Sequence, residues 1–466
     1  MGVLRIPEEI YAEASAHLLR GPGERFAFFD ARVDRAGAEV VFAVHGVTLV
    51  PGERVRLGPA GYDIDPSYLL DLVNDAVRGA YALVEAHNHG GALPRFSRLD
   101  LEQLGEFAPY VLDSLGGRPY AATVWGEESV YGLYYSEPDR ARPLRSICAV
   151  GERLLQVVSR DDDLALVDAG FDRQLPWFTA AGQRRLGRLR AFVVGAGGTA
   201  SPLVLELAYL GLRDLFVIDP DDSDDTSMNR LMTAAAADVG MPKAQLARRA
   251  VLAIAPAAAA HALRCDVRTR DALDALKGAD VIFGCVDNDG ARLVLNELAV
   301  AYGIPYLDLG VAIEADGGAV SEAGGRLAAV VPGGPCLLCM DLLDLREAAY
   351  FLAGPEQRRL QRELGYVRGL DVPAPAVVSL NGTIASLAAT ELALYASGIR
   401  RPNPLTILDV LGVGRAPGQW TVPERVARRD GCVHCHRAGC GDRAGIERYA
   451  ITGPSPPIGD GRPLAA

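Results

Sequence analysis

At 466 residues the chain is too long for one ordinary hydrophobic core, so we expect at least two domains. Its hydrophobic fraction of 49% and charged fraction of 23% are those of a soluble globular protein, and its net charge of −12 argues against nucleic acid as the main partner. The N-terminus has no basic segment followed by an apolar core, so we expect no signal peptide and a cytoplasmic location. The longest apolar stretch, Val377 to Tyr395, contains Asn381 and Glu391 and therefore predicts a buried helix rather than a membrane span.

Changes in composition along the chain predict where the domains divide. Residues 136–143 are rich in turn-forming and charged side chains, and a run of three aspartates follows shortly after. A regular alternation of strand-like and helix-like segments begins behind them. We expect an N-terminal domain at residues 1–145, a linker at 146–165, a second domain at 166–450 and a flexible tail rich in proline and glycine at 451–466.

The N-terminal domain contains a group of metal-binding residue types. His87 and His89 are one residue apart, so on an extended segment their side chains point the same way and can hold one metal ion. The carboxylate of Asp100 can supply a third ligand and leave one position open for water. Three protein ligands plus water are typical of a catalytic zinc rather than a structural one. The alternative is a polar loop with two incidental histidines.

The full pattern, His-x-His followed after seven residues by Ser-x-x-Asp, resembles the motif of the JAMM (MPN+) metalloproteases, which are zinc isopeptidases of the deubiquitinase type. The resemblance implies an α/β metalloprotease domain and two further roles. Ser97 would donate a hydrogen bond to the developing oxyanion. Glu24, which precedes a short apolar strand, would deprotonate the zinc-bound water and then protonate the leaving amine. The alternative for Glu24 is a solvated carboxylate in a loop.

The second domain opens with an apolar strand that runs into a glycine-rich turn. Gly195 and Gly197 begin a Gly-x-Gly-x-x-Ala pattern, a helix-like segment follows, and the next strand ends at Asp219. In such a βαβ unit the glycines let phosphate approach a helix N-terminus, and an acid about 20 residues later reaches a ribose hydroxyl. The pattern predicts nucleotide binding, but it would fit a NAD enzyme equally well.

Charged residues farther along the chain favour adenylation over hydride transfer. Arg230 and Lys243 would bring two cations toward a polyphosphate, and Asp287 at the end of another apolar strand could hold Mg²⁺. A hydride-transfer enzyme has no need of these groups. Adenylation must stabilise charge on a phosphate that a carboxylate attacks, and it must position pyrophosphate with magnesium.

In their order, these motifs are similar to those of the ubiquitin-activating-enzyme family in its ThiF/MoeB-type form, over roughly residues 165 to 445. The resemblance implies a Rossmann-like adenylation domain that uses ATP and Mg²⁺. It assigns the phosphates to Gly195, Gly197, Asn229, Arg230 and Lys243, the ribose to Asp219 and Mg²⁺ to Asp287.

The resemblance also concerns the oligomeric state. Arg173, in Asp172-Arg173-Gln174, fits a family arginine that reaches into the ATP site of the neighbouring protomer, so we expect a homodimer. The chain departs from the family pattern at Ala200, Ser227 and Leu231. These departures affect the expected ribose and phosphate contacts more than the fold.

Two Cys-x-x-Cys pairs predict a second metal site. Cys336 and Cys339 form one pair, and Cys432 and Cys435 form the other. Four thiolates make a tetrahedral zinc site with no open position, which is therefore structural. In a chain without export signals this spacing favours metal over disulfides. The residues that could replace one of these ligands are His434, His436 and Cys440.

A catalytic cysteine is missing from the place where ubiquitin-activating enzymes carry it, since no cysteine lies between Cys339 and Cys432. We expect the remaining Cys148, Cys265 and Cys285 to be buried and inert. The product would then be the acyl adenylate, passed to a sulfur donor, an amine or the cysteine of a conjugating enzyme. The alternative is a thioester on a thiol outside the usual loop.

Together the resemblances imply a bifunctional enzyme of a bacterial ubiquitin-like modification or sulfur-carrier pathway. A zinc peptidase or isopeptidase would act at the C-terminus of a ubiquitin-like or sulfur-carrier protein, and an adenylating domain would activate the same carboxylate. We expect no nucleic acid or membrane partner. Two alternatives stay open, namely adenylation of a peptide or small metabolite and a binding scaffold in which one domain is inactive.

Overall fold

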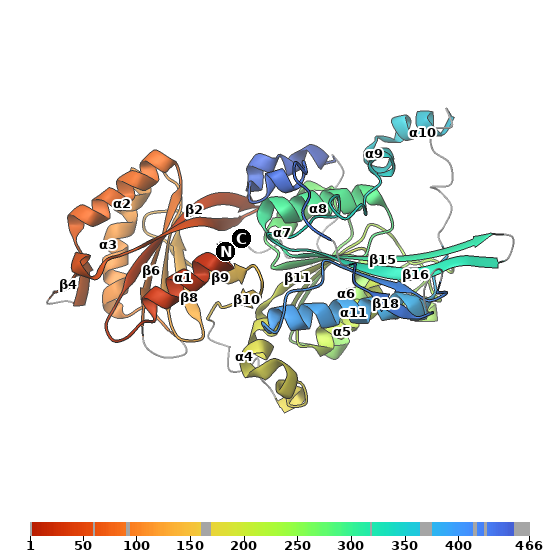
Figure 1. Ribbon diagram of the computed structural model, residues 1–466, viewed down its shortest axis with the longest axis horizontal. Helices are drawn as coiled ribbons and strands as arrows, with labels where there is room; N and C mark the ends of the chain where they lie inside the picture. The colour runs from red at the N-terminus through yellow and green to blue at the C-terminus, as the bar shows by residue number, and fades with distance from the viewer. Residues whose placement is uncertain are drawn as a thin grey trace. The chain divides into compact units, whose positions relative to one another are not determined.

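The computed structural model describes residues 2–58, 61–89, 94–159, 169–316, 319–363, 375–412, 417–423 and 426–451. Its contacts divide the chain into two compact units, the first made mainly of residues up to Arg188 and the second mainly of residues from Leu189 onward (Figure 1). The linker predicted at 146–165 differs from the structure in its first part, because residues 146–150 and 154–156 lie in strands, and Ile147 and Leu155 of these strands join a core of the first unit. Residues 160–165 of that linker and the tail after Ile451 lie outside the described residues.

The first unit is built on one closed sheet. Its strands pair in the order β1-β3-β2-β6-β7-β8-β9-β10, and β1 also pairs with β9. The strands are β1 (Gly2–Pro7), β2 (Phe26–Ala36), β3 (Glu39–Leu49), β6 (Ala82–Asn88), β7 (Tyr120–Trp125), β8 (Val130–Tyr135), β9 (Ala141–Val150) and β10 (Leu154–Gln156), with β4 (Val55–Gly58) and β5 (Gly61–Ile64) as a separate pair. The helices are α1 (Glu8–Leu18), α2 (Pro66–Gly79), α3 (Arg98–Ser114) and α4 (Leu175–Arg188).

Helices cover the two faces of this sheet. Leu18 of α1 is buried in one core with Val84 of β6, whereas α2 and α3 contribute to a second core with Leu83. Because side chains alternate along a strand, His87 belongs to the same face of β6 as Leu83. The alternation therefore directs His87 toward the face that α3 covers.

The second unit is a doubly wound α/β fold. Its strands are β11 (Arg190–Val194), β12 (Asp214–Ile218), β13 (Ala259–Leu263), β14 (Val281–Gly284), β15 (Tyr306–Asp316), β16 (Ala319–Val330), β17 (Leu405–Asp409) and β18 (Gln419–Thr421). Its helices are α5 (Ala200–Tyr209), α6 (Lys243–Ile254), α7 (Arg270–Lys277), α8 (Asp289–Tyr302), α9 (Leu345–Leu352), α10 (Pro355–Glu363) and α11 (Val378–Ala396). Helix α11 matches the helix predicted across the apolar stretch. No helix within the described ranges is long and apolar enough to cross a membrane.

The order of the strands places a ligand-binding crevice in this unit. The sheet runs β13-β12-β11-β14-β15-β16-β17-β18, parallel from β13 to β15 and antiparallel beyond. Helices α7 and α8 lie over one face, and α5, α6 and α11 lie over the other (Figure 1). The chain leaves β11 toward β12 on one side and returns to β14 on the other. Ligands of such sheets bind at the carboxyl ends of the strands beside this switch point. The predicted βαβ unit and Rossmann-like fold are confirmed.

Candidate functional site

Two histidines and an aspartate of the first unit converge as the sequence predicted. The Nε2 atoms of His87 and His89 lie 3.7 Å and 3.4 Å from one carboxylate oxygen of Asp100. His87 is near the end of β6, His89 follows it, and Asp100 lies in the first turn of α3. The three side chains each offer a ligand atom within 4.8 Å of the others, which fits one metal ion.

The orientation of the imidazoles also fits a metal ion. Nδ1 of His89 is 2.9 Å from the carbonyl oxygen of Arg95, an acceptor that makes Nδ1 the protonated nitrogen and leaves Nε2 as a free donor to metal. His87 is 3% exposed, yet neither of its ring nitrogens has a hydrogen-bond partner among the described residues. A buried polar atom without a partner is costly, and a metal ion at Nε2 would satisfy this one.

The charges around His87 show how strongly the cluster attracts a cation. Burial disfavours charge on both His87 and Asp100. Their proximity nevertheless raises the pKa of His87 to about 9, with a further contribution from Glu85, and lowers the pKa of Asp100 to about 2. Oε1 of Glu85 lies 3.8 Å from Nδ1 of His87, and the hydroxyl of Tyr120 donates to Oε2 of Glu85 at 2.6 Å. These carboxylates favour a proton on the imidazole of His87, and a bound metal ion would replace that proton.

Glu24 lies beside the same cluster. Its Oε1 is 3.7 Å from Nε2 of His89. Asn88 holds the segment around Glu24, because its Oδ1 accepts from the backbone N–H of Arg25 at 2.6 Å and its Nδ2 donates to the carbonyl of Gly23 at 3.2 Å. The sequence analysis missed this role of Asn88, although its place between the two histidines could have drawn attention to it.

Ser97 shapes the acidic side of the cluster. It is the N-cap of α3, where its Oγ accepts from the backbone N–H of Asp100 at 3.1 Å and its own N–H donates to Oδ2 of Asp100 at 2.6 Å. This capping box fixes the carboxylate that faces both imidazoles. The side chain of Ser97 is exposed, so its hydroxyl proton remains available to a ligand.

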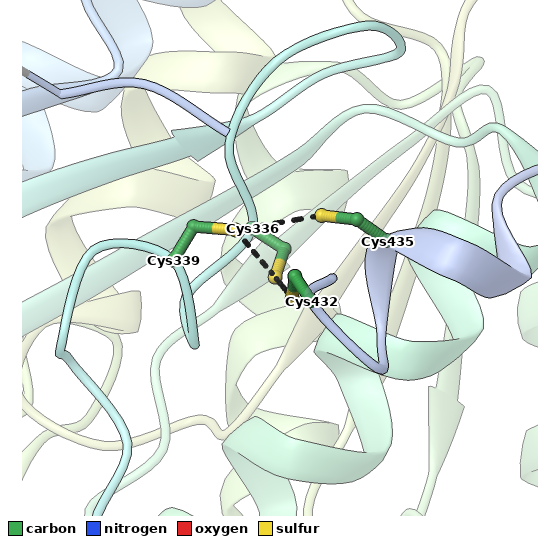
Figure 2. Close-up of side chains that lie close together, drawn as sticks. All are labelled: Cys336, Cys339, Cys432 and Cys435. Carbon is green, nitrogen blue, oxygen red and sulfur yellow. Dashed lines mark hydrogen bonds between the residues drawn. The ribbon is translucent and has the colours of Figure 1, made fainter. Parts of the chain in front are cut away.

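The four cysteines of the Cys-x-x-Cys pairs meet in the second unit (Figure 2). Their Sγ atoms are 3.6–3.8 Å apart, from Cys336 to Cys339 and Cys432, and from Cys339 to Cys435. Tetrahedral zinc with Zn–S bonds of about 2.3 Å requires sulfur atoms about 3.8 Å apart, whereas a disulfide requires about 2.05 Å. The spacing therefore fits a structural zinc.

Helix α8 forms hydrogen bonds with residues inside both Cys-x-x-Cys pairs. Oδ1 of Asn296 accepts from the backbone N–H of Leu337 at 2.8 Å, and its Nδ2 lies 2.9 Å from Nδ1 of His434. Nε2 of His434 is 3.2 Å from Glu297 of the same helix. His434 is thus engaged with α8, and it is not a member of the four-residue cluster that the described residues form.

A cavity of about 1090 Å³ opens at the switch point of the second sheet. It is large for a small-molecule pocket, since such pockets usually measure about 300–1,000 Å³. Most residues that the sequence assigned to a nucleotide line it, namely Gly195, Gly197, Asp219, Arg230, Lys243 and Asp287. Asn229 and Arg173 are not among the described residues that line it; both are exposed, and Arg173 lies in a turn of the first unit.

Local contacts explain the shape of the cavity beside the glycine-rich turn. Gly195 has φ +89°, and an added Cβ would overlap the carbonyl oxygen of Cys285, which directly follows β14, so only glycine fits there. Asp219 is buried, which raises its pKa, and its carboxylate accepts from the backbone N–H groups of Ala196 at 2.6 Å and Asp221 at 2.8 Å. Asp219 thus fixes the glycine-rich turn as well as facing the cavity. Nζ of Lys243 pairs with Asp221 at 3.1 Å.

A buried charge cluster that the sequence did not predict includes two arginines that line the cavity. Asp308 on β15 is fully buried and lies 3.4 Å from Nε of Arg292 and 3.6 Å from Nη2 of Arg326. The hydroxyl of Tyr306 donates to it at 2.7 Å. Burial opposes charge on Arg292, but Asp308 and Asp289 raise its pKa. Arg292 and Arg326 both line the cavity. Because they lie on different elements, α8 and β16, no local sequence pattern indicated that they meet.

Cys285 departs partly from the expectation that the remaining thiols are buried bystanders. Cys148 and Cys265 are buried, whereas Cys285 is partly exposed; both Cys265 and Cys285 line the cavity. Its surroundings disfavour a thiolate, because burial and the nearby Asp308 raise the pKa of the thiol. A thiol must ionise to act as a nucleophile, so this position is poorly suited to thioester formation.

Similarity to known proteins identifies the second unit. The ThiF family profile matches residues 171–435, more than half of the 466-residue chain. The chain belongs to the ThiF family. Its site is therefore built on the α/β fold of that family, with the cavity and the cysteine cluster inside the matched range.

Individual relatives of this ThiF-family chain match smaller parts of it. A probable adenylyltransferase/sulfurtransferase MoeZ of Mycobacterium tuberculosis is 35% identical over 133 residues, which cover 28% of this chain and 34% of MoeZ. The SAMP-activating enzyme E1 of Haloferax volcanii is 31% identical over 159 residues, which cover 34% of this chain and 56% of that enzyme. The solved structure of E. coli MccB with ATP has a TM-score of 0.46 at 16% identity and covers 58% of this chain and 75% of MccB. The two curated relatives are thus matched over about a third to just over half of their lengths.

Proposed function

We propose that the second unit adenylates the C-terminal carboxylate of a ubiquitin-like or sulfur-carrier protein. The observation that carries this proposal is the gathering of a glycine-rich turn, Arg230, Lys243 and Asp287 in one cavity at the switch point of the sheet. Family membership supports it, as do the names of the relatives, which are adenylyltransferases and an activating enzyme. The size of the cavity leaves room for a nucleotide and the end of a peptide.

The residues of the cavity would divide the work of this reaction. A carboxylate oxygen of the partner attacks the α-phosphorus of ATP, a new C–O–P linkage forms, and the bond to pyrophosphate breaks. Arg230 and Lys243 would stabilise the negative charge that develops on the phosphates. Asp287 would supply an oxygen ligand for Mg²⁺, an ion that neutralises the departing pyrophosphate.

Lys243 would change partners when nucleotide binds. In the structure its ammonium group pairs with Asp221, which is 64% exposed and so holds the ammonium only weakly. A polyphosphate carries more charge than one carboxylate and would attract Lys243 away from Asp221. Lys243 is the first residue of α6, and it can exchange Asp221 for a phosphate by a rotation of its side chain alone.

Exchange of labelled pyrophosphate into ATP tests the proposal. With a candidate ubiquitin-like protein present, the wild-type chain should catalyse exchange, and Lys243→Ala or Asp287→Ala should reduce the rate by at least about a hundredfold. The matched control is Asp225→Ala, which removes an exposed carboxylate outside the cavity. Exchange that requires a short peptide or metabolite instead of a ubiquitin-like protein would reassign the substrate, and no exchange with any of them would refute adenylation.

We further propose that the first unit is a zinc-dependent peptidase that acts at the same kind of C-terminus. The convergence of His87, His89 and Asp100, with Glu24 3.7 Å from His89, supports this proposal. A zinc ion held by the two imidazoles and Asp100 would supply a Lewis acid and lower the pKa of a bound water.

The side chains around the cluster would carry the proton and bind the substrate carbonyl. Glu24 would accept the proton of the attacking water at its carboxylate and return it to the leaving amine. Ser97 would donate its hydroxyl proton to the substrate carbonyl oxygen, because its Oγ uses only acceptor capacity within the capping box. Asn88 would keep Glu24 in place through its bonds to the neighbouring backbone.

Cleavage of an extended ubiquitin-like protein tests this second proposal. Mass spectrometry should show that the zinc-loaded chain removes a C-terminal extension and that Glu24→Gln abolishes the removal. The control Glu13→Gln alters an exposed glutamate on α1 and should cleave normally. Cleavage that survives Glu24→Gln or strong chelation would contradict the assignment.

A further inference from the structure

A buried asparagine of α11 lines the cavity together with the glycine-rich turn. Asn381 lies in the first turns of α11 and is 3% exposed, and it lines the cavity together with Pro375 and Ala376 just before the helix. The helix is buried farther along by residues such as Ile384 and Leu392. A buried amide among apolar side chains costs free energy unless it is hydrogen-bonded.

The partners of this amide leave its donor unused. Among the described residues, the hydroxyl of Thr199 donates to Oδ1 of Asn381 at 3.5 Å, and Nδ2 donates to none. Thr199 is the N-cap of α5, directly after the glycine-rich turn. The contact with Thr199 therefore directs Nδ2, which carries two N–H groups, toward the turn and the cavity.

Gly198 shows how close the amide is to the phosphate-binding turn. A Cβ added at Gly198 would overlap Nδ2 of Asn381 and would lie 3.0 Å from Cδ of Arg230. The side chains of Asn381, from α11, and Arg230, from the loop before α6, thus both lie against the backbone of Gly198. Backbone N–H groups of such a turn, at the start of a helix, form an anion-binding site.

We propose that Asn381 is a nucleotide-binding residue that donates from Nδ2 to a phosphate oxygen of ATP. The proposal rests on the proposed adenylation function. It explains why an amide lines the cavity beside the glycine-rich turn, and why residue 198 next to that amide is glycine. Asn381 would add a neutral donor beside the cation Arg230. This amide would orient the phosphate without adding positive charge.

Binding of Mg·ATP and of adenosine to the full-length, zinc-loaded chain tests the proposal. Asn381→Leu keeps the approximate size and removes the donor, so its affinity for Mg·ATP should fall about tenfold or more. Adenosine has no phosphate, and its affinity should change less than about twofold. Asn381→Asp has the same shape but adds negative charge, so it should weaken Mg·ATP more than Asn381→Leu does. Calorimetry, with adenosine as a competitor, gives both affinities.

A control variant on the same helix, and the comparison of the affinities for Mg·ATP and adenosine, decide whether the proposal holds. Thr383→Val removes an exposed hydroxyl that donates to the carbonyl of Ser379, its one hydrogen-bond partner among the described residues, and the variant should bind both ligands normally. Wild-type affinity of Asn381→Leu for Mg·ATP, or an equal loss of Mg·ATP and adenosine, would overturn the proposal. If Asn381→Leu does not fold, the same comparison on Asn381→Asp decides. Failure of the wild-type chain to bind Mg·ATP at all would instead refute the adenylation function.

Discussion

Nε2 of His89 lies 3.7 Å from a carboxylate oxygen of Glu24, which brings the end of β6 next to the segment before β2. The register of these strands produces this contact, since Phe26 pairs with His87 across the antiparallel ladder. The carboxylate proposed as the base and the imidazole proposed as a metal ligand are thus positioned by one pair of strands.

Removing the histidines should remove one of two metal ions. We expect the purified chain to carry two zinc ions and His87→Ala with His89→Ala to carry one, with folding largely intact because the site is open on one side. Inductively coupled plasma mass spectrometry measures the content. His45→Ala, which alters an exposed histidine on β3, should keep both ions. Two equivalents in the double variant would rule out the site.

The cysteine cluster should behave differently because it stabilises the fold. Cys336→Ser should lose the second zinc ion and lower the free energy of unfolding of the second unit by at least about 3 kcal/mol, since binding of a structural zinc contributes to folding. Denaturant titration measures the change. Cys440→Ser alters a partly buried cysteine outside the cluster and should keep the zinc. Equal stability of the two variants would show that the cluster holds no structural metal.

Two glycines of the same turn should separate stability from binding. Gly195→Ala should cost about 1–3 kcal/mol of unfolding free energy, because an alanine is strained at φ +89° and its Cβ overlaps Cys285. Gly197→Ala meets no atom within 4 Å and should fold normally, yet its methyl group would stand in the cavity and weaken Mg·ATP. Thermal unfolding with and without Mg·ATP distinguishes them. An unstable Gly197→Ala would mean that the turn is packed differently.

No covalent thioester should form on this chain. Incubation with Mg·ATP and a ubiquitin-like protein should give an adenylate but no adduct sensitive to reductant, because Cys265 and Cys285, which both line the cavity, have thiols whose pKa is raised by burial. Non-reducing gels and intact mass spectrometry detect such an adduct. An adduct mapped to Cys285 or Cys440 would identify the nucleophile and contradict this expectation.

Local patterns predicted the elements of both sites, but contacts across the chain required the structure. The spacing of His87 and His89 and the glycines after β11 follow from strand alternation and turn chemistry, which short segments encode. The role of Asn88 depends on the register between β2 and β6. Asp308, Arg292 and Arg326 come from three elements, so their cluster has no sequence spacing. Asn381 stood out only as a polar residue in an apolar stretch, and the structure shows that it lies against Gly198.

The central claim is that two separate sites of one chain act on the same C-terminus, and pyrophosphate exchange with two forms of one ubiquitin-like protein tests it most directly. One form carries a C-terminal extension and the other is already trimmed. The wild-type chain should support exchange with both, because the proposed peptidase activity of its first unit would remove the extension. Glu24→Gln should support exchange with the trimmed form at the wild-type rate and none with the extended form. Equal exchange with both forms by Glu24→Gln, or loss of exchange with the trimmed form, would contradict the account.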